Sequence, residues 1–346
     1  MASKHQMDKQ KAVIQLQYGN SRDALIFSDT HPVNELMADE VKIRVYATSV
    51  NPIDWQMMEG NRRLIHKRTF PFVPFFDIAG DVVAVGSSVR RFKTGDAVYC
   101  DNKINGGGLS EYVNVKEDLV SIKPANISYA AAAAVPLAAQ TAYLALTKGG
   151  LTKNSRVCII GASGGVGSFA VQIAKALGAS TVIGVCSKKN SDFVRSLGAD
   201  ITVDYTTTKW AGLLDKNSLD MVIDCVGGKE QWLDAKKVLR SQGRFVTIAR
   251  DEDEKVTVPS ALKLAVNIGL RMISAYFGRK IAYVPVFLDA SHTLLDKVSE
   301  LIQAGRINPW LGKIYTFNMD NVHQVIQESK TGRMVGKTVI QIAGDK

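Results

Sequence analysis

The chain has few cysteines, and none of them share a metal-binding spacing. The four cysteines in its 346 residues are Cys100, Cys158, Cys186 and Cys225. No Cys-x-x-Cys pair exists, which excludes a structural four-cysteine zinc site. Three of the four lie in or at the ends of apolar, strand-like segments, so we expect reduced thiols that act as small core residues. Reduced thiols are typical of the cytosol, and we expect a cytoplasmic protein.

Long apolar runs are also missing. The longest, Ala130 to Ala142, is too short and too rich in alanine to span a bilayer, so we expect no integral membrane segment. The charged N-terminus is not followed by the apolar core of a secretory signal. Hydrophobic residues make up 46% of the chain, which excludes wholesale disorder. At about 100–200 residues per domain, the length predicts two domains.

The chain does carry an excess of positive charge, with a net charge of +10. Its lysines and arginines are dispersed and form only short doublets such as Arg62-Arg63 and Arg90-Arg91. A dispersed excess is typical of a solvated surface, so a nucleic-acid partner is not expected. A cofactor that carries several phosphate charges would account for part of the excess. A protein that binds RNA or a membrane-associated partner under cofactor control remains an alternative.

A glycine-rich turn follows a short apolar strand near the middle of the chain. Val157 to Ile160 is typical of a buried strand, and an apolar helical pattern follows the turn. Between them, Ala162-x-Gly164-x-x-Gly167 fits the dinucleotide fingerprint, with alanine in the first glycine position. Such a strand, turn and helix point backbone N–H groups and the positive end of a helix dipole at one spot, which suits a pyrophosphate.

A second strand, Thr181 to Cys186, gives this fingerprint its context. It ends about 20 residues beyond the glycines, where the fingerprint expects an acid for the ribose 2′-hydroxyl. The segment Ser187-Lys188-Lys189-Asn190 stands there and contains no acid. Hydroxyl, ammonium and amide groups donate to phosphate oxygens, whereas a carboxylate would repel a 2′-phosphate. The sequence therefore predicts NADPH as the cofactor, against the alternative of a solvated basic turn.

The first part of the chain, from about 11 to 136, is rich in strand patterns with glycine between them. Val41 to Ala47 alternates with period two, as a half-buried strand does. Three further segments, Asp77 to Gly86, Gly95 to Tyr99 and Leu109 to Val115, complete a predicted antiparallel, barrel-like set.

From about 137 to 282 strands alternate with helices, which predicts a doubly wound parallel sheet with its ligand crevice at the carboxyl ends of the strands. After the first two strands we expect four more, at Ile201 to Tyr205, Asp220 to Val226, Phe245 to Ala249 and Met272 to Phe277. A helix, Phe287 to Ala304, and a strand, Lys337 to Ile342, end the chain. The strand is expected to rejoin the first domain.

Several motifs in one order carry a family resemblance over nearly the whole length. They are Asn51-Pro52-Ile53-Asp54, Asp77-Ile78-Ala79-Gly80, Phe92-Lys93-Thr94-Gly95-Asp96, Gly108-Leu109-Ser110-Glu111-Tyr112, Leu137 to Tyr143, Leu197-Gly198-Ala199-Asp200, and Asp224-Cys225-Val226-Gly227-Gly228. The chain resembles the zinc-free quinone oxidoreductases of the medium-chain dehydrogenase/reductase superfamily. The resemblance implies a GroES-like antiparallel β-barrel catalytic domain over 1–136 and 283–346 and a Rossmann domain over 137–282.

Relatives that are alcohol dehydrogenases carry a catalytic zinc on a cysteine and, some twenty residues later, a histidine. The matching positions here are Asn51 and Phe76, and neither side chain is a plausible zinc ligand. We therefore expect no metal and no Lewis acid to polarise a carbonyl oxygen. Acceptors must then be electrophilic enough to take hydride unaided, as quinones and enones are.

The resemblance also implies which residues contact the cofactor. Asn51 would contact the nicotinamide ribose and Thr141 the nicotinamide, whereas Tyr205 would cover the adenosine. For each there is a plain alternative: a turn residue before Pro52, a threonine bonded to its own helix, and core packing at a strand end. The other expected contacts are Ser163, Gly164, Gly165 and Val166 in the turn, Ser187, Lys189 and Asn190 at the 2′-phosphate, Cys225, Val226, Ile248 and Ala249 at strand ends, and Phe277, Gly336 and Lys337 near the nicotinamide.

For the acceptor, Tyr46 and Trp55 flank Asn51 and could form an aromatic pocket for a flat quinone, or be ordinary core aromatics. No proton donor is evident, because none of the five histidines matches a family catalytic position. We therefore expect a homodimeric, zinc-independent NADPH:quinone oxidoreductase that transfers hydride in the cleft between the domains. An NADPH-dependent enone or enal reductase is the alternative enzyme.

Overall fold

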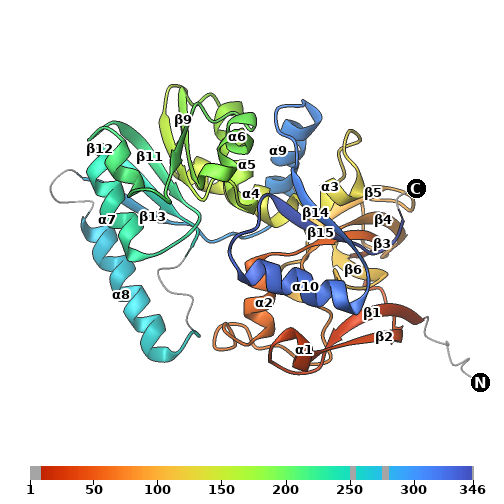
Figure 1. Ribbon diagram of the computed structural model, residues 1–346. Coiled ribbons are helices and arrows are strands. Elements are labelled where there is room, and N and C mark those ends of the chain that lie inside the picture. Colours follow the sequence, from red (N-terminus) through yellow and green to blue (C-terminus); the bar gives the residue numbers. More distant parts are fainter. Residues whose placement is uncertain (1–8, 250–254, 275–279, 345–346) are drawn as a thin grey trace, which may run out of the picture.

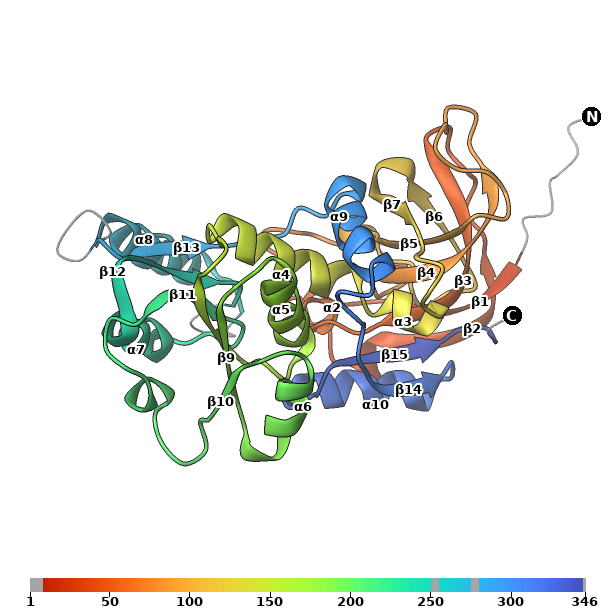
Figure 2. The ribbon, with the colours of Figure 1, turned by 90° about the horizontal axis from the view of Figure 1, so that it is seen from above.

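The computed structural model describes residues 9–249, 255–274 and 280–344, which form two lobes side by side. One lobe is built on a parallel sheet and the other on a mostly antiparallel sheet (Figure 1). Seen from above, the C-terminal strands lie within the second lobe, beside strands from the start of the chain (Figure 2). The α/β fold with a Rossmann domain and a GroES-like domain is confirmed.

The parallel sheet has six strands in the order β10-β9-β8-β11-β12-β13. They span β8 Arg156–Ile160, β9 Thr181–Cys186, β10 Ile201–Asp204, β11 Leu219–Asp224, β12 Leu239–Thr247 and β13 Ala282–Pro285. The chain runs outward in one direction from β8 through β9 and β10, and then returns to add β11 on the other side. The carboxyl end of β8 therefore lies at the topological switch point, where this fold binds its ligand.

Helices cover both faces of this sheet, because successive side chains of β8 point to opposite faces and belong to two different apolar clusters. Val157 and Ile159 belong to the cluster formed with α4 Pro136–Lys148 and α5 Gly165–Ala176. Cys158 and Ile160 belong to the cluster on the other face, with α7 Lys229–Val238. Strands buried on both faces appear in sequence as continuous apolar runs, and such runs predict β8 and β9.

The sixth strand is not where the sequence predicts it. Residues 258–274 form α8, Val258–Ser274, and the rest of the expected strand Met272 to Phe277 lies outside the described residues. Apolar residues in α8 recur every three to four positions, which is the period of a helix (Val258, Leu262, Val266, Leu270, Ile273). The sixth strand is instead β13, which crosses the domain boundary expected between 282 and 283.

The second lobe carries a sheet in the order β14-β15-β3-β4-β5-β7, with β6 paired to β3. Its strands are β3 Glu40–Ser49, β4 Asp77–Val85, β5 Ala97–Asp101, β6 Tyr112–Lys116, β7 Val120–Ile122, β14 Leu311–Thr316 and β15 Lys337–Gln341. The pairs are antiparallel except β14 with β15, which is parallel. The expected return of the last strand is confirmed, because β15 pairs with β3.

Shorter elements complete this lobe. They are the ribbon of β1 Lys9–Gln15 and β2 Leu25–Pro32, and the helices α1 Ser21–Ala24, α2 Pro52–Met58, α3 Tyr129–Ala133 and α10 Met319–Lys330. Helix α6 Ser191–Ser196 belongs to the parallel-sheet lobe, and α9 His292–Gln303 packs against α4. Helix α9 begins later than the predicted Phe287, because the Ser291 side chain caps it by accepting from the backbone N–H of Leu294.

Gly167 sets how closely α5 approaches β8. A Cβ atom on Gly167 would lie 2.1 Å from the carbonyl oxygen of Gly161 and 2.8 Å from Cα of Ala162. We expect Gly167→Ala to lower the free energy of unfolding by roughly 2–4 kcal/mol, because backbone atoms must move to admit the methyl group. Gly269→Ala in α8 is the matched control, since no described atom lies within 4 Å of the added carbon. It should be neutral or stabilising by up to about 1 kcal/mol. Equal denaturation midpoints for the two variants would contradict this account.

Candidate functional site

The turn after β8 is built for an anion. Gly161 has φ +78°, a left-handed conformation that glycine adopts readily, and the chain then enters α5. Gly164 caps α5 and has no side chain to accept from the first N–H groups, which are left for a ligand. A Cβ atom on Gly164 would meet only the Gly161 carbonyl oxygen, at 3.4 Å. The turn residues Ser163, Gly164, Gly165 and Val166 therefore fit a pyrophosphate group.

The end of β9 carries the expected basic segment. Lys188–Asn190 form a short 3-10 helix, in which Lys189 is exposed, and the Asn190 amide donates to Ser163 Oγ at 3.1 Å. This bond links Asn190 to the turn after β8. No acid ends β9, but Asp204 from the end of β10 accepts from the backbone N–H of Lys188 at 3.1 Å. Hydrogen bonds from Thr206 hold the pKa of Asp204 below its usual value, so a charge that sequence reasoning missed lies nearby.

Other strand ends lie along the same edge. Tyr205 follows β10 and Val226 follows β11, and both side chains are more than half exposed. The backbone N–H of Cys225 donates to the Ile160 carbonyl, and that of Ile248 donates to the Asp224 carbonyl, while Ala249 follows Ile248. Burial raises the pKa of the Cys225 thiol, which disfavours the thiolate needed for a nucleophile. Phe277 lies outside the described residues.

A buried polar cluster lies where β15 meets β3 and β4. The ammonium group of Lys337 donates to Asn51 Oδ1 at 2.6 Å, to the Val50 carbonyl at 2.9 Å and to Asp77 Oδ2 at 3.5 Å. The Asn51 amide nitrogen donates to Asp77 Oδ2 at 2.8 Å. Lys337 and Asn51 are each 3% exposed and Asp77 is 0% exposed. We call these three residues the Lys337 cluster.

Two more buried carboxyl groups stand near the cluster. Asp54 accepts from the backbone N–H of Asn51 at 2.6 Å, and burial raises its pKa well above its usual value. Burial, followed by the charge of Asp77, raises the pKa of Asp101 to about 7. Burial lowers the pKa of Lys337, and the negative charge of Asp77 opposes this shift. The surroundings of the cluster therefore hold protons that exposed carboxyl groups would lose at neutral pH.

The Lys337 cluster adjoins the phosphate turn. The backbone N–H of Gly336 donates to the Ser163 carbonyl at 2.9 Å. A Cβ atom on Gly165 would lie 3.0 Å from Cδ of Lys337, so the lysine stem passes directly beside the turn. The structure thus brings together Ser163, Gly165, Gly336, Lys337 and Asn51, which the sequence separates by up to 286 positions.

The remaining predicted residues have other neighbours. The Tyr46 ring stacks on Tyr129 at 4.5 Å, and its hydroxyl group donates to Asp81. The Trp55 ring nitrogen donates to Ser329 Oγ of α10 at 3.2 Å.

Thr141 and Phe76 also contact neighbouring groups of the protein. The Thr141 hydroxyl donates to the Leu137 carbonyl of its own helix at 2.7 Å, which is the plain alternative considered above. Phe76, at the second zinc-ligand position, is buried with the Arg68 guanidinium 5.7 Å from its ring centre.

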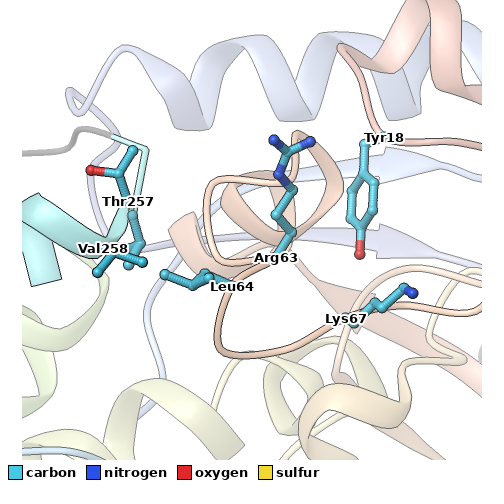
Figure 3. A pocket seen from close by; sticks show the side chains of 7 residues that line it. Tyr18, Arg63, Leu64, Lys67, Thr257 and Val258 are labelled. Carbon is cyan, nitrogen blue, oxygen red and sulfur yellow. The ribbon is translucent and has the colours of Figure 1, made fainter.

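A cavity of about 460 Å³ opens between the lobes. One side is formed by Tyr18 and by the loop after α2, and the other by Val256 and Thr257 and by Val258, the first residue of α8 (Figure 3). The backbone N–H of Val256 donates to the Asn61 carbonyl and joins the two sides. The residues that line the cavity are Tyr18, Arg63, Leu64, Lys67, Val256, Thr257 and Val258.

Within the described ranges, no helix combines the length and apolarity needed to cross a membrane. In that same part of the chain, no group of three or more histidine, cysteine, aspartate or glutamate side chains could hold a metal ion.

Comparison with known proteins identifies two domains. Residues 37–125 match the alcohol dehydrogenase GroES-like domain, and residues 165–290 match the zinc-binding dehydrogenase domain. A 2-methylene-furan-3-one reductase of Solanum lycopersicum is 34% identical over 93% of this chain and 76% of its own length. A chloroplastic quinone-oxidoreductase of Triphysaria versicolor is 33% identical over 87% of this chain and 89% of its own. The solved quinone oxidoreductase of Coxiella burnetii superposes with a TM-score of 0.80 at 25% identity, covering 97% of this chain and all of that one.

The raised pKa of Asp101 predicts a specific pH dependence. Between about pH 4 and pH 7 the folded protein holds a proton on Asp101 that the unfolded chain lacks, so raising the pH through this window lowers the free energy of unfolding. Asp101→Asn keeps the oxygen that accepts from the Lys103 N–H but removes the titration. We expect the variant to gain roughly 1–3 kcal/mol on the wild type between pH 4 and pH 8. Urea unfolding at several pH values measures this. Asp29→Asn, at an exposed position, is the control, and equal pH profiles for wild type and Asp101→Asn would contradict the assignment.

Proposed function

Because this chain belongs to the medium-chain dehydrogenase/reductase superfamily, among its quinone oxidoreductases, we propose that it transfers hydride from NADPH to a quinone without zinc. The similarity to these relatives shows that the chain is an oxidoreductase of this superfamily. The observation that carries the proposal is the Lys337 cluster, which sets a buried amide beside the phosphate turn.

The cofactor is NADPH on this proposal, and when bound it supplies the hydride. The first N–H groups of α5 would bind the pyrophosphate, and Gly164 and Gly165 would let it approach the backbone. Ser187, Lys189 and Asn190 would bind the 2′-phosphate, because they are donors at the end of β9. Tyr205, Cys225, Val226, Ile248 and Ala249 would contact the rest of the cofactor along the strand ends.

The charge of Lys337 supports zinc-free chemistry. Its ammonium nitrogen lies 2.6 Å from Asn51 Oδ1, the side chain at the first zinc-ligand position of the alcohol dehydrogenases. A zinc ion bound by Asn51 would stand beside this positive charge, and the Phe76 ring offers no lone pair in exchange. The acceptor must therefore be electrophilic on its own, as a quinone is.

An enone is the second candidate acceptor. The tomato relative is named for the reduction of 2-methylene-furan-3-one, and it matches 93% of this chain. Hydride delivery to such an acceptor needs the same cofactor geometry as delivery to a quinone.

Assembly and location remain proposals. A homodimer is supported by β13, an edge strand of the parallel sheet, and by exposed apolar residues of the neighbouring α8 such as Leu262 and Leu270. The expected cytoplasmic location stays a prediction, since the Triphysaria relative is chloroplastic by name.

Lys189 provides the test of cofactor choice. Lys189→Glu should weaken NADPH binding by on the order of 1–3 kcal/mol and leave NADH binding nearly unchanged, because the 2′-phosphate then meets a like charge. Lys153→Glu makes the same charge change in an exposed loop before the amino end of β8, away from the strand ends, and should change neither Kd. Titration calorimetry with both cofactors measures the effect. An unchanged Kd for NADPH in Lys189→Glu would remove this lysine from the site.

An acceptor panel tests the reaction itself. We expect NADPH-dependent reduction of 1,2- or 1,4-quinones that persists with a strong chelator, and a primary isotope effect in single turnovers with NADPH deuterated at C4. The panel compares kcat/KM for quinones, enones and enals. Turnover of enals with none of the quinones would leave the cofactor assignment intact and replace quinone by enal. Activity lost on chelation and restored by zinc would overturn zinc independence.

A further inference from the structure

The side chain of Asn51 is held in one orientation by two neighbouring groups of opposite charge, one at each end of its amide. Its Oδ1 faces the Lys337 ammonium and its Nδ2 faces the Asp77 carboxylate. An amide rotated by 180° would place a donor against the ammonium and an acceptor against the carboxylate. That arrangement is repulsive at both ends, so the hydrogen-bond network alone assigns the orientation.

The two charges are themselves fixed. Asp77 accepts from Ser49 Oγ at 2.7 Å and from the backbone N–H of Leu137 at 2.8 Å, in addition to Asn51. The three protons of the Lys337 ammonium have acceptors in Val50, Asn51 and Asp77. Because the residues are buried, water does not compete for these bonds, and the charges act at a low effective dielectric.

One donor of the Asn51 amide has no partner among the residues that the structure describes. Nδ2 carries two protons, one of which goes to Asp77 Oδ2. We propose that Lys337 and Asp77 are positioning residues. They hold the Asn51 amide in one orientation, an arrangement that we call the lock, so that its second N–H is presented to the cofactor or acceptor. This role rests on the proposed function, and it differs from direct phosphate binding by Lys337, whose ammonium protons already have protein acceptors.

The same lysine connects this lock to the cofactor turn. Its stem passes beside Gly165, and the preceding Gly336 is bonded to Ser163. The turn therefore positions Lys337, and Lys337 positions the Asn51 amide. As a result, the distance between the pyrophosphate site and the Asn51 amide is fixed.

Substitution of Lys337 separates positioning from cofactor binding. Lys337→Met keeps much of the stem but removes the ammonium, and we expect kcat to fall about 10- to 100-fold. The Kd for NADPH should stay within about threefold of the wild type. Lys337→Arg, which keeps a cation that can donate to Asn51, should retain more of kcat than Lys337→Met. Lys313→Met, on the neighbouring strand β14 and half-exposed, is the control and should leave kcat unchanged. A weakened Kd with an unchanged kcat would make Lys337 a phosphate ligand and overturn the proposal.

A double variant separates positioning from stability. Lys337→Met alone leaves the Asp77 carboxylate buried without its cation, which destabilises the fold. Asp77→Asn with Lys337→Met removes both charges and should recover much of the lost stability. On our proposal kcat stays low in the double variant, because nothing holds Asn51 Oδ1. Recovery of kcat together with stability would show a purely structural pair and overturn the proposal.

The lock can also be tested by a measurement that needs no turnover, so that its failure and the failure of the proposed function can be told apart. In ¹⁵N-labelled protein, with the Asn51 signal assigned by its loss in Asn51→Ala, one Nδ2 proton should exchange slowly with solvent. Lys337→Met should remove this protection. Slow exchange in a protein that reduces no acceptor would sustain the lock and refute the function. Rapid exchange in the wild type would refute the lock even if the enzyme is active.

Discussion

The buried Lys337 ammonium is the constraint on which the rest of the site depends. A charge removed from water costs several kcal/mol unless acceptors replace the water. Here those acceptors come from Val50 and Asn51 between β3 and α2 and from Asp77 of β4, while the lysine itself begins β15. Segments far apart in the chain must therefore meet at one point before the lysine is satisfied, and that point lies beside the phosphate turn.

Polar groups of one lobe also find hydrogen-bond partners in the other lobe, and these bonds join the two lobes. The backbone N–H at Leu137, in the first turn of α4, donates to Asp77, so a helix that packs on the parallel sheet begins at a carboxylate of the other lobe. The backbone N–H of Asn308 donates to Gln172 of α5 at 2.7 Å. These bonds are polar and specific, and they fix the cleft more narrowly than apolar packing alone would, because a hydrogen bond fails when its atoms shift by a fraction of an ångström.

The sequence predicts the parallel sheet better than it predicts the site. Strands β8 and β9 are apolar runs that end at glycine or polar residues, and such strands can be predicted from neighbouring residues alone. The expected strand at Met272 to Phe277 is wrong where the structure describes it, because apolar spacing over 258–274 extends a helix into that segment. The burial of Asp77, Asp54 and Asp101 has no local signal in the sequence. Asp77 and Asp101 resemble ordinary strand ends, and Asp54 lies in the first turn of α2, where an acid is common. Their burial is set by tertiary contacts that bring β3, β4, β5 and β15 together.

The state of the lysine also limits the chemistry that this site can perform. A Lewis-acid metal acts by binding the acceptor oxygen in an open coordination position. The Lys337 ammonium has no open position, because its three protons are donated to Val50, Asn51 and Asp77. It can orient the Asn51 amide and raise the local potential, but it cannot take the acceptor oxygen without breaking a bond to the protein. On the proposed function, then, the lysine acts through the Asn51 amide, and hydride transfer depends on an acceptor that is already electron-poor.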